Sequence, residues 1–494
     1  MNVLPIFILL PLGAGFIMLL SHRLGKRLPD FIANAAVFFL VLMAFSLYFF
    51  RTPGTVMIYK TGCLPVNIGV NLVLDGLSHL LLLTVNLVAF LITFYSVQYM
   101  EKYTKAEKYF SLLLLMIAGM NGVVLTGDLV SLFIFMELAA VSGCALVAFG
   151  TESEELEAAF KYLVMGSVAS IFILFAFIMI YGLTGTTNMA DISQSFPGNA
   201  GHARILITLL LLMGFGTKSA IIPFHAWLPD AHPAAPAPIS AMLSGVLIKA
   251  LGIYALVRIF FNVLGMTPQL SNIFTTLGVI SILAGVIMAL GQWDFKRLLA
   301  YHSISQIGYV MLGLGLATPL GILGGLFHLF NHAIFKPLLF LAAGSVEYST
   351  GTRQLKELGG LRRKMPVTAN MSLAASLAIS GIPPFNGFWS KLFIIIACIQ
   401  AGKLWLAFAA VIGSILTLSS FMKIQKYVFF KELPARLHNV GESPWMMLSS
   451  MSVLALLCFV IGLFFPVVVS FLINPAVISV AGGISYGRLV LGGY

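Results

Sequence analysis

The sequence predicts an all-α polytopic membrane protein with about fourteen transmembrane helices. Of its 494 residues, 60% are hydrophobic and only 9% are charged, whereas soluble domains contain roughly 25% charged residues. The mean hydropathy is +1.01. Apolar runs of about 20 residues recur between short polar connections, and this is the length that crosses a ~30 Å hydrocarbon core as a helix.

The predicted spans follow one another along almost the whole chain. They lie near 3–21, 31–50, 73–99, 109–126, 128–149, 158–182, 204–222, 237–261, 272–291, 298–316, 320–346, 368–400, 405–425 and 446–471. The first is read as a retained span because no basic region and no small-residue cleavage site accompany it. Only Gly127 and Asp128 separate the fourth span from the fifth. The twelfth is long and is interrupted by Gly381, Pro383 and Pro384.

The distribution of lysine and arginine tests this count and orients the chain. Connections after odd-numbered spans, with the span ends that border them, hold eighteen of the 28 basic residues, and those after even-numbered spans hold five. Because basic connections stay in the cytoplasm, the odd-numbered connections are predicted to be cytoplasmic and both termini to lie on the outer face. The net charge of +11 is then explained by basic loops rather than by a nucleic-acid partner.

Two segments of the chain resemble each other. Residues 219–230 (SAIIPFHAWLPD) and 380–391 (SGIPPFNGFWSK) share Ser, Ile, Pro and Phe at a constant offset of 161. Each is a proline-containing break in or beside a span. The first belongs to span seven and the second to span twelve, which run in opposite directions, as an inverted-topology repeat requires.

No cofactor or metal site is expected on this chain. The four cysteines, Cys63, Cys144, Cys398 and Cys458, show no Cys-x-x-Cys or Cys/His spacing and are interpreted as apolar filler. The sequence also contains no nucleotide fingerprint, iron–sulfur cysteine set or haem motif. Any redox chemistry would therefore belong to partner chains.

Ionisable residues inside the apolar spans are the main indication of function. Such a group costs at least roughly 2.5–3.5 kcal/mol to insert and normally marks ion or proton traffic. Glu137 lies about 13 Å along its helix from Asp128, and Lys218 directly precedes the first proline break. Lys249 is too deep in its span for easy snorkelling, and Lys391 follows the second break.

A further group lies on one helix face. His328, His332 and Lys336 are spaced i, i+4 and i+8, so they form a stripe about 12 Å long. Imidazoles relay protons near neutral pH, and no carboxylate or cysteine joins them to suggest a metal site. Packed structural histidines and haem ligation are the alternatives. The possible accessory groups are Asp75, His79, His225, Asp230 and His302.

Four motifs carry a resemblance to a known family. They are TKSAIIPFHAWLPDAHPAAPAPISAMLSGVLIK (217–249), WDFKRLLAYHSISQIGYVMLGLG (293–315), HLFNHAIFKPLLFLAAGSV (328–346) and SGIPPFNGFWSK (380–391). Together they resemble the antiporter-like subunits of respiratory complex I. The same pattern is found in Mrp-type cation/proton antiporters and in membrane-bound hydrogenase and formate hydrogenlyase complexes.

The resemblance implies a specific organisation. It implies two inverted five-helix repeats, each with a broken helix, over 109–261 and 272–425. A three-helix segment (1–108) would precede them, and the last helix with a short tail (426–494) would follow. It also implies a mid-membrane row of polar residues: Glu137 on helix five, Lys218 on broken helix seven, Lys249 on helix eight, His328, His332 and Lys336 on helix eleven, and Lys391 on helix twelve.

The resulting hypothesis is a proton-translocating, antiporter-like subunit of a redox-driven or Mrp-type pump in the inner (cytoplasmic) membrane. Its implied partners are antiporter-like paralogues, a redox module and the lipid bilayer. The chain itself would not be the redox enzyme of a complex I-like NADH dehydrogenase, hydrogenase or formate hydrogenlyase. Three alternatives remain at this point: a Na⁺/H⁺ exchange subunit, a non-conducting membrane scaffold and an organic-solute carrier.

Overall fold

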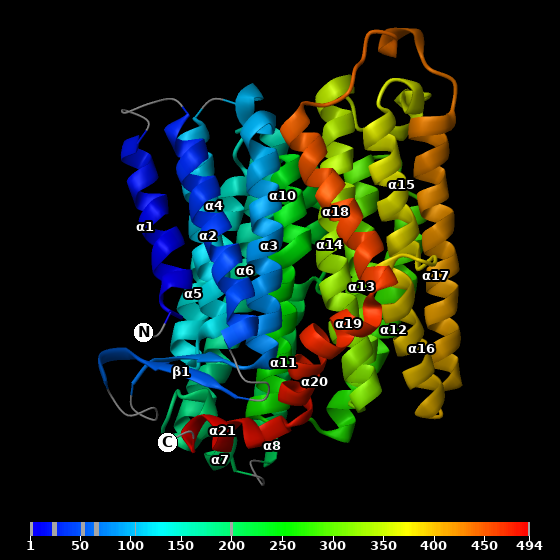
Figure 1. Cartoon of the computed structure of the whole chain (residues 1–494). Helices are drawn as coiled ribbons and strands as arrows, with labels where there is room; N and C mark the ends of the chain where they lie inside the picture. The colour runs from blue at the N-terminus through cyan, green and yellow to red at the C-terminus, as the bar shows by residue number, and fades with distance from the viewer. Residues whose placement is uncertain are drawn as a thin grey trace.

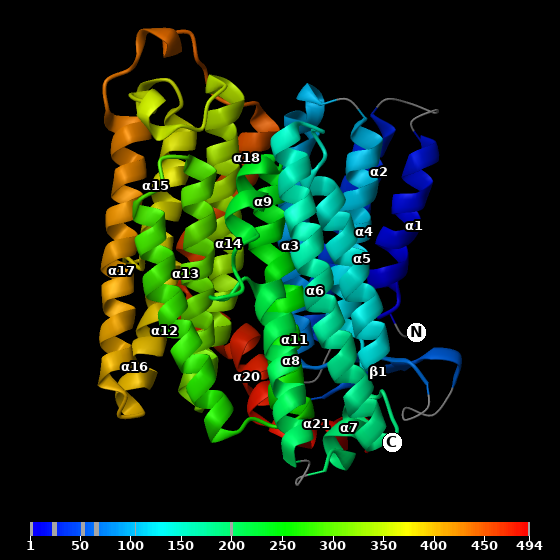
Figure 2. The same cartoon turned by 180° about the vertical axis from the view of Figure 1, so that it is seen from behind.

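The computed structural model describes residues 3–21, 27–50, 55–63, 69–103, 105–197 and 201–492. Within them, long helices run side by side along one direction and form a single bundle (Figure 1). The first half of the chain occupies one side of the bundle and most of the second half occupies the other, while the last residues run beneath the first half, as the view from behind also shows (Figure 2).

The helices of the first half begin close to the predicted positions. They are α1 (Ile6–Ser21), α2 (Leu28–Phe50), α3 (Gly76–Tyr99), α4 (Ala106–Leu125), α5 (Leu129–Val147), α6 (Ser153–Thr184), α7 (Met189–Ser195), α8 (Gly201–Ser219), α9 (Leu228–Ala234), α10 (Ala237–Met242), η3 (Leu243–Leu247), η4 (Lys249–Tyr254), α11 (Ala255–Val257) and η5 (Arg258–Val263). The last five are one continuous helical segment, in which η3, η4 and η5 are π-helical turns.

The second half is built in the same way. Its helices are α12 (Pro268–Leu290), α13 (Phe295–Gly315), α14 (Pro319–Thr350), α15 (Pro366–Ser380), α16 (Asn386–Gln400), α17 (Leu404–Ile424), η8 (Gln425–Phe430), α18 (Trp445–Leu463), α19 (Phe465–Val468), η10 (Val469–Ile473), α20 (Asn474–Ala481) and α21 (Tyr486–Leu491). Short 3₁₀ turns lie at Thr61–Cys63, Met100–Lys102, Leu355–Glu357, Leu361–Arg363, Ala435–Leu437 and Gly483–Ser485.

Side-chain caps explain several of these boundaries. The carboxylate of Asp128 accepts the backbone N–H of Ser131 at 2.8 Å and starts α5. The narrow boundary expected between spans four and five is therefore confirmed. Asp294 and Thr318 cap α13 and α14 in the same way, which satisfies N–H groups that a helix start leaves unpaired.

The described residues contain ten helices that are long and apolar enough to cross a bilayer. An eleventh span results if the pair Phe465–Ala481 and Gly483–Leu491, bent by 97°, is counted as one. The prediction of a helical, multi-pass membrane protein is confirmed. The other four predicted spans correspond to α1, which is shorter, to α8/α9 and α15/α16, which are broken, and to α13, which is 21 residues long but is not among the ten.

Three expectations were wrong in detail. Residues 73 and 74, assigned to the third span, belong to strand β2 (Asn71–Leu74), which pairs antiparallel with β1 (Met57–Lys60). The third helix begins only at Gly76 because Asp75 caps it. The fourteenth predicted span does not reach residue 471, since α18 ends at Leu463 and the chain then bends.

The third error concerns a basic residue. Arg258, near the end of the predicted span 237–261, was counted with the connection that follows this span, but it is buried, only 2% exposed, within the helical segment Ala237–Val263. Its guanidinium is held by Asp75, so a buried partner makes this position possible. The excess of basic residues after odd-numbered spans becomes larger when Arg258 is removed from the count.

Both proline segments interrupt a helix. α8 ends at Ser219 and α15 ends at Ser380, and the next residues, Ala220 (φ 55°) and Gly381 (φ 80°), are both left-handed. These two stop positions are 161 residues apart, which is the offset found in the sequence. In Figure 2, α9 lies above α8, so the chain enters the first pair from below. In Figure 1, α15 lies above α16, so the chain enters the second pair from above. The two pairs therefore run in opposite directions.

Candidate functional site

Glu137 and Lys218 form an ion pair between α5 and α8. Lys218 Nζ lies 3.1 Å from Glu137 Oε1, and the hydroxyl of Ser170 on α6 donates to the same oxygen at 2.5 Å. The lysine side chain is 3% exposed and the glutamate side chain 31% exposed. The carboxylate therefore collects two donors from two helices while one side of it stays open at the surface of the chain.

The break after α8 places Lys218. The helix stops one residue beyond it, and the indole of Trp227 donates to the backbone oxygen of Thr217 at 2.9 Å, which fixes the end of the helix. Gly252 of η4 lies against the same helix end, because a Cβ there would stand 2.6 Å from the Cα of Ser219. This close approach brings the helix that carries Lys249 next to the one that carries Lys218.

Lys249 is buried in the π-helical part of the bundle. Its ammonium donates to the backbone oxygen of Ser244 at 2.5 Å, and the Ser244 hydroxyl lies 2.7 Å from that of Ser303 on α13. π-Helical turns are frequent at functional positions. In the described part of the chain, no carboxylate lies within ion-pair distance of Lys249.

The stripe on α14 lies entirely in the interior. His328 contacts Ser390 Oγ through Nδ1 (3.0 Å) and Gln306 Oε1 through Nε2 (3.2 Å), so it joins α13, α14 and α16. Lys336 donates to the backbone oxygen of Leu299 at 2.5 Å. Among the described residues, neither ring nitrogen of His332 has a hydrogen-bond partner.

Lys391 ends the row of buried lysines. Its Nζ donates to the backbone oxygen of Ile379 at 2.8 Å and lies 4.6 Å from the centre of the Tyr309 ring. Beside it is a mostly apolar cavity of about 240 Å³ that Gly381, Ser414 and Ile415 also line. Ile415 lines the same cavity and is exposed on the outside of the bundle. The cavity therefore reaches the surface beside the break between α15 and α16, close to Lys391.

The accessory groups fall into two classes. Asp75 binds Arg258 with both carboxylate oxygens, at 2.7 and 2.8 Å. His79 contacts the backbone oxygen of Ala44 at 2.9 Å, and the buried His302 contacts Ser420 Oγ at 2.8 Å. The partners of these three residues differ from those that Lys218, Lys249, Lys336 and Lys391 contact. His225, by contrast, lies half-buried in the break between α8 and α9.

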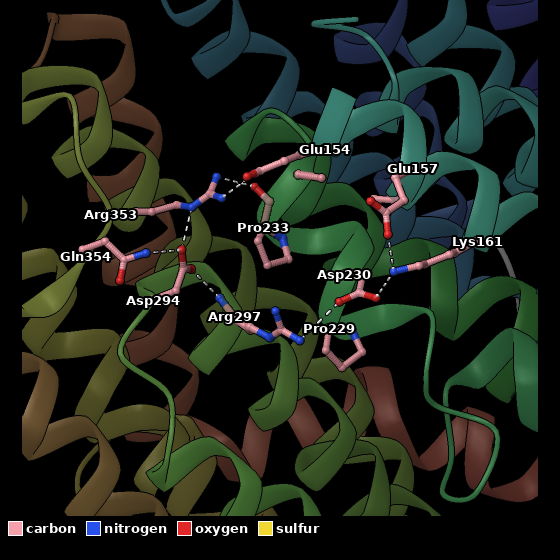
Figure 3. A pocket seen from close by; sticks show the side chains of 12 residues that line it. Glu154, Glu157, Lys161, Pro229, Asp230, Pro233, Asp294, Arg297, Arg353 and Gln354 are labelled. Atoms are coloured by element: carbon pink, nitrogen blue, oxygen red, sulfur yellow. Dashed lines mark hydrogen bonds and ion pairs between the residues drawn. The ribbon is translucent and has the colours of Figure 1, made fainter. Parts of the chain in front are cut away.

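Asp230 belongs to a polar cavity of about 370 Å³ at one end of the bundle, shown in Figure 3. We call this cavity the polar vestibule; it is lined by Glu154, Glu157, Ala158, Lys161, Pro229, Asp230, Pro233, Ala234, Asp294, Arg297, Arg353 and Gln354. Lys161 and Arg297 reach Asp230 at 3.1 and 3.3 Å. Arg353 binds Asp294 at 2.6 Å. Burial lowers the pKa of the Arg353 guanidinium, but Asp294 and Glu347 outweigh that effect and hold the pKa above its ordinary value.

Several charged groups were missed by the sequence analysis. Arg258, Lys296 and Glu347 are all buried or largely buried and all ion-paired. Lys296 and Glu347 fall just outside the predicted spans, and for that reason they resemble residues of connections. In the described residues, no group of three or more His, Cys, Asp or Glu side chains is arranged to hold a metal ion.

Comparisons with known proteins agree with the resemblance seen in the motifs. Residues 126–417 match the family model described as "NADH:quinone oxidoreductase/Mrp antiporter, TM". Residues 63–110 match the model described as "NADH-Ubiquinone oxidoreductase (complex I), chain 5 N-terminus".

Similar proteins come from two kinds of complex. The chain is 34% identical over 439 residues to NADH-quinone oxidoreductase subunit N of Desulforudis audaxviator. The aligned residues make up 87% of each chain. It is 33% identical over 433 residues to an Na(+)/H(+) antiporter subunit of Alkalihalophilus pseudofirmus, again over 87% of each. A chain in the structure of the Mrp complex from Dietzia sp. DQ12-45-1b superposes with a TM-score of 0.92, at 28% identity and 99% coverage of both chains.

Proposed function

We propose that this chain, which belongs to the family of antiporter-like membrane subunits of NADH:quinone oxidoreductases and Mrp antiporters, moves protons through the row of buried lysines and histidines. The observation that carries the proposal is the Glu137–Lys218 ion pair at a helix break inside the bundle. Ionisable groups at membrane depth are costly, and where they occur they normally mark an ion or proton pathway. Irregular backbone at that depth occurs only where protein or water satisfies it.

The proposed organisation is fourteen spans with two inverted five-helix repeats, over 109–261 and 272–425, between the segments 1–108 and 426–494. The left-handed stops at Ala220 and Gly381, the equal offset and the opposite order of the two half-helices support this repeat. Both described chain ends lie towards the same end of the bundle (Figure 1). Since most basic connections lie at the other end, we assign that end to the cytoplasm and the termini to the outer face.

The proposed mechanism begins at the ion pair. While Glu137 holds Lys218, the carboxylate favours the charged lysine; when the pair opens, burial favours release of the proton. The proton then passes Lys249 and the stripe of His328, His332 and Lys336 towards Lys391. Water is required to bridge the gaps between these side chains. The hydroxyls of Ser244 and Ser303 and the amide of Gln306 lie beside the row.

The proposed partners are other membrane subunits and a redox or antiport module. The names of similar proteins support this, because they are subunits of multisubunit complexes. The outer faces of α5, α6 and α17 expose large apolar side chains. Either neighbouring subunits or lipid would cover them.

A double substitution tests transport against a purely scaffolding role. We expect Lys249→Ala with Lys391→Ala to reduce proton translocation by the assembled complex at least tenfold, because both buried relay groups are lost. The measurement is acidification of proteoliposomes that contain the complex. The matched control is Lys105→Ala with Lys108→Ala, since both of these lysines are exposed. Unchanged translocation in the first double variant would favour the scaffold.

Sodium exchange is the second candidate, favoured by the similarity to an Na(+)/H(+) antiporter subunit. Hard cations prefer several oxygen ligands, but the Glu137 oxygen at the ion pair already receives two donors, Lys218 and Ser170. We therefore expect the same proton transport when choline replaces sodium on both sides of the membrane. A strict requirement for sodium would favour the exchanger instead.

A further inference from the structure

The carboxylate of Glu137 has a second neighbour besides Lys218. Ser170 of α6 is buried, only 5% exposed, and its hydroxyl oxygen lies 2.5 Å from Glu137 Oε1. The same hydroxyl oxygen lies 2.9 Å from the backbone oxygen of Gly166, about one helical turn earlier. A serine hydroxyl carries one proton and two lone pairs. It therefore has one proton to share between these two acceptors, and the carboxylate is the nearer one.

Gly166 and Ser170 face the ion pair from the same side of α6. They are four residues apart, so they lie on one face of the helix. A Cβ added at Gly166 would stand 4.0 Å from Lys218 Nζ. This face of α6 therefore presents backbone without a side chain to the lysine and a hydroxyl to the glutamate.

Ser170 differs from an ordinary buried serine of a membrane helix. Serine hydroxyls inside helices often bond the carbonyl oxygen four residues earlier. Ser142 of α5, which is 4% exposed, donates to Leu138 in this way at 2.8 Å, its one side-chain hydrogen bond within the described residues. Ser170 has the same backbone acceptor available, yet it lies closer to the carboxylate. Because hydrogen bonds to charged acceptors are the stronger ones, this hydroxyl is expected to follow the charge of Glu137.

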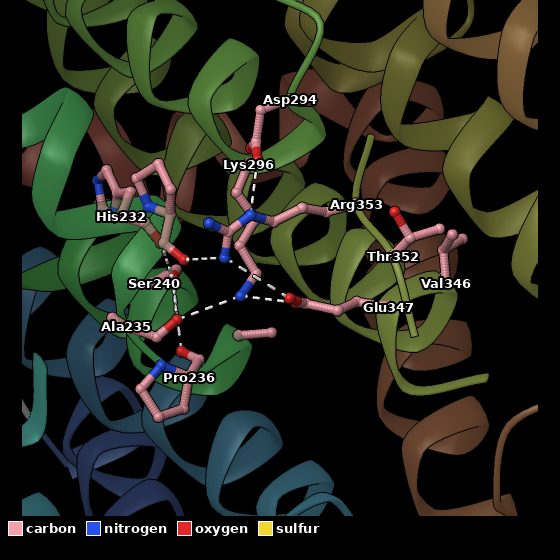
Figure 4. Close-up of polar contacts among 12 residues, drawn as sticks. His232, Ala235, Pro236, Ser240, Asp294, Lys296, Val346, Glu347, Thr352 and Arg353 are labelled. Atoms are coloured by element: carbon pink, nitrogen blue, oxygen red, sulfur yellow. Dashed lines mark hydrogen bonds and ion pairs between the residues drawn. The ribbon is translucent and has the colours of Figure 1, made fainter. Parts of the chain in front are cut away.

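Another buried lysine–glutamate pair of this chain is built differently. Lys296 of α13 binds Glu347 of α14 at 2.7 Å and also donates to the backbone oxygen of Ala235 at 3.2 Å (Figure 4). Arg353, which lines the polar vestibule, places a second cation 3.7 Å from the same glutamate. In the part of the chain that the structure describes, no hydroxyl donates to Glu347. Additional partners on both members hold this pair closed.

Lys218 is held by fewer contacts. Within the described residues, its ammonium has one hydrogen-bond acceptor, Glu137 Oε1 at 3.1 Å. If the lysine turns away, Glu137 still keeps the hydroxyl of Ser170 as a donor. A buried carboxylate without any partner is costly, and the retained hydrogen bond lowers that cost. The pair can therefore open on the lysine side while Glu137 stays in place.

We propose that Ser170 is a positioning residue of the Glu137–Lys218 pair and that its hydroxyl supports both protonation states of Glu137. While Glu137 is charged, the hydroxyl donates to Oε1, whether Lys218 is present or has turned away. When Glu137 takes up a proton, the hydroxyl donates to the Gly166 carbonyl instead and accepts the O–H of the carboxylic acid. Ser170 turns but neither gains nor loses a proton. This inference rests on the proposed function and adds the residue that allows the pair to open.

Removing the hydroxyl is the first test. We expect Ser170→Ala to lower proton translocation by the complex in proteoliposomes about tenfold, because opening the pair then leaves Glu137 without a donor. Ser142→Ala is the matched control, since it removes a serine hydroxyl of similar burial, and it should transport normally. Lys218→Ala is measured in the same series. Wild-type transport by Ser170→Ala with loss in Lys218→Ala overturns this inference alone, whereas wild-type transport by Lys218→Ala overturns the proposed function.

Two variants of equal shape separate the hydroxyl from packing. Threonine and valine differ in that threonine has a hydroxyl where valine has a methyl group. We expect Ser170→Thr to transport about fivefold faster than Ser170→Val, because only threonine can donate to the carboxylate. Native gels check that both complexes assemble. Equal transport by the two variants would mean that position 170 acts through packing, which contradicts the proposal.

The vibrational spectrum of Glu137 gives a readout that packing alone does not change. On acidification, protonated Glu137 should produce a carboxylic C=O stretching band in the infrared difference spectrum of the complex, identified by its loss in Glu137→Gln. We expect Ser170→Ala to shift this band to higher frequency, because the acid loses a hydrogen-bond partner. The band should stay in place in Ser142→Ala. An unshifted band in Ser170→Ala would show that the hydroxyl does not bind the protonated acid and would overturn the proposal.

Discussion

Glu137→Gln and Lys218→Ala are each expected to reduce proton translocation to the background of an empty membrane. Glutamine keeps the shape of the side chain but removes the charge that holds Lys218 Nζ at 3.1 Å. The buried lysine then has no opposite charge, so it cannot alternate between a paired, protonated state and an unpaired state that gives its proton away. Alanine at 218 removes the proton carrier itself.

The experiment compares assembly with transport. Removing one member of a buried pair costs about 3–5 kcal/mol, and the cost is smaller here because Glu137 is 31% exposed. The complex should therefore assemble, as native gels would show, while proteoliposomes fail to acidify. Glu357→Gln is the matched control because it breaks an exposed pair with Arg436. Full pumping by either of the first two variants would disprove a role for this ion pair in transport.

The helical bundle was predictable because apolar runs of membrane length leave few alternatives. The start of α5 was also predictable, since a single capping residue, Asp128, separates two runs. The hairpin of β1 and β2 was not, because its second strand continues the apolar run into α3. The bend after Leu463 was missed for the same reason: Phe465–Ala481 is apolar enough to read as a continuation of the span.

The candidate site was predictable where a charge interrupts an apolar run. Lys218 and Lys249 were found in this way, and their helices do lie against each other at Ser219 and Gly252. His232, which stands in the proline-rich segment after the break, was not singled out, although its side chain is fully buried. Its ring packs 4.8 Å from that of Phe340, which is about a hundred residues away along the chain. Contacts of that range are set by helix packing, which periodicity does not encode.

Arg258 was missed for a different reason. It lies close to the end of its apolar run, so it resembled a loop residue, and its partner Asp75 was named only as a possible accessory group. A pairing rule would have found it: a buried arginine near a span end needs a carboxylate on a neighbouring helix. Asp75 lies at the corresponding end of another predicted span and would have been the candidate.

The buried pair of Asp75 and Arg258 is the part of the chain where a single substitution should most reduce stability. Arg258 binds both carboxylate oxygens of Asp75 and the hydroxyl of Ser78 at the start of α3. Its guanidinium also lies 4.8 Å from the centre of the Tyr486 ring on α21. The interaction therefore joins the first half of the bundle to the helices after the bend.

We expect Arg258→Met to destabilise the folded chain by about 3–5 kcal/mol, because it leaves a buried carboxylate without its partner. Adding Asp75→Asn should recover much of this loss, since asparagine removes the charge and still caps α3. The measurement is thermal unfolding of the detergent-solubilised protein, with Arg488→Met as control because Arg488 is exposed on α21. If the single and double variants melt together, the destabilisation comes from lost packing and not from an uncompensated charge.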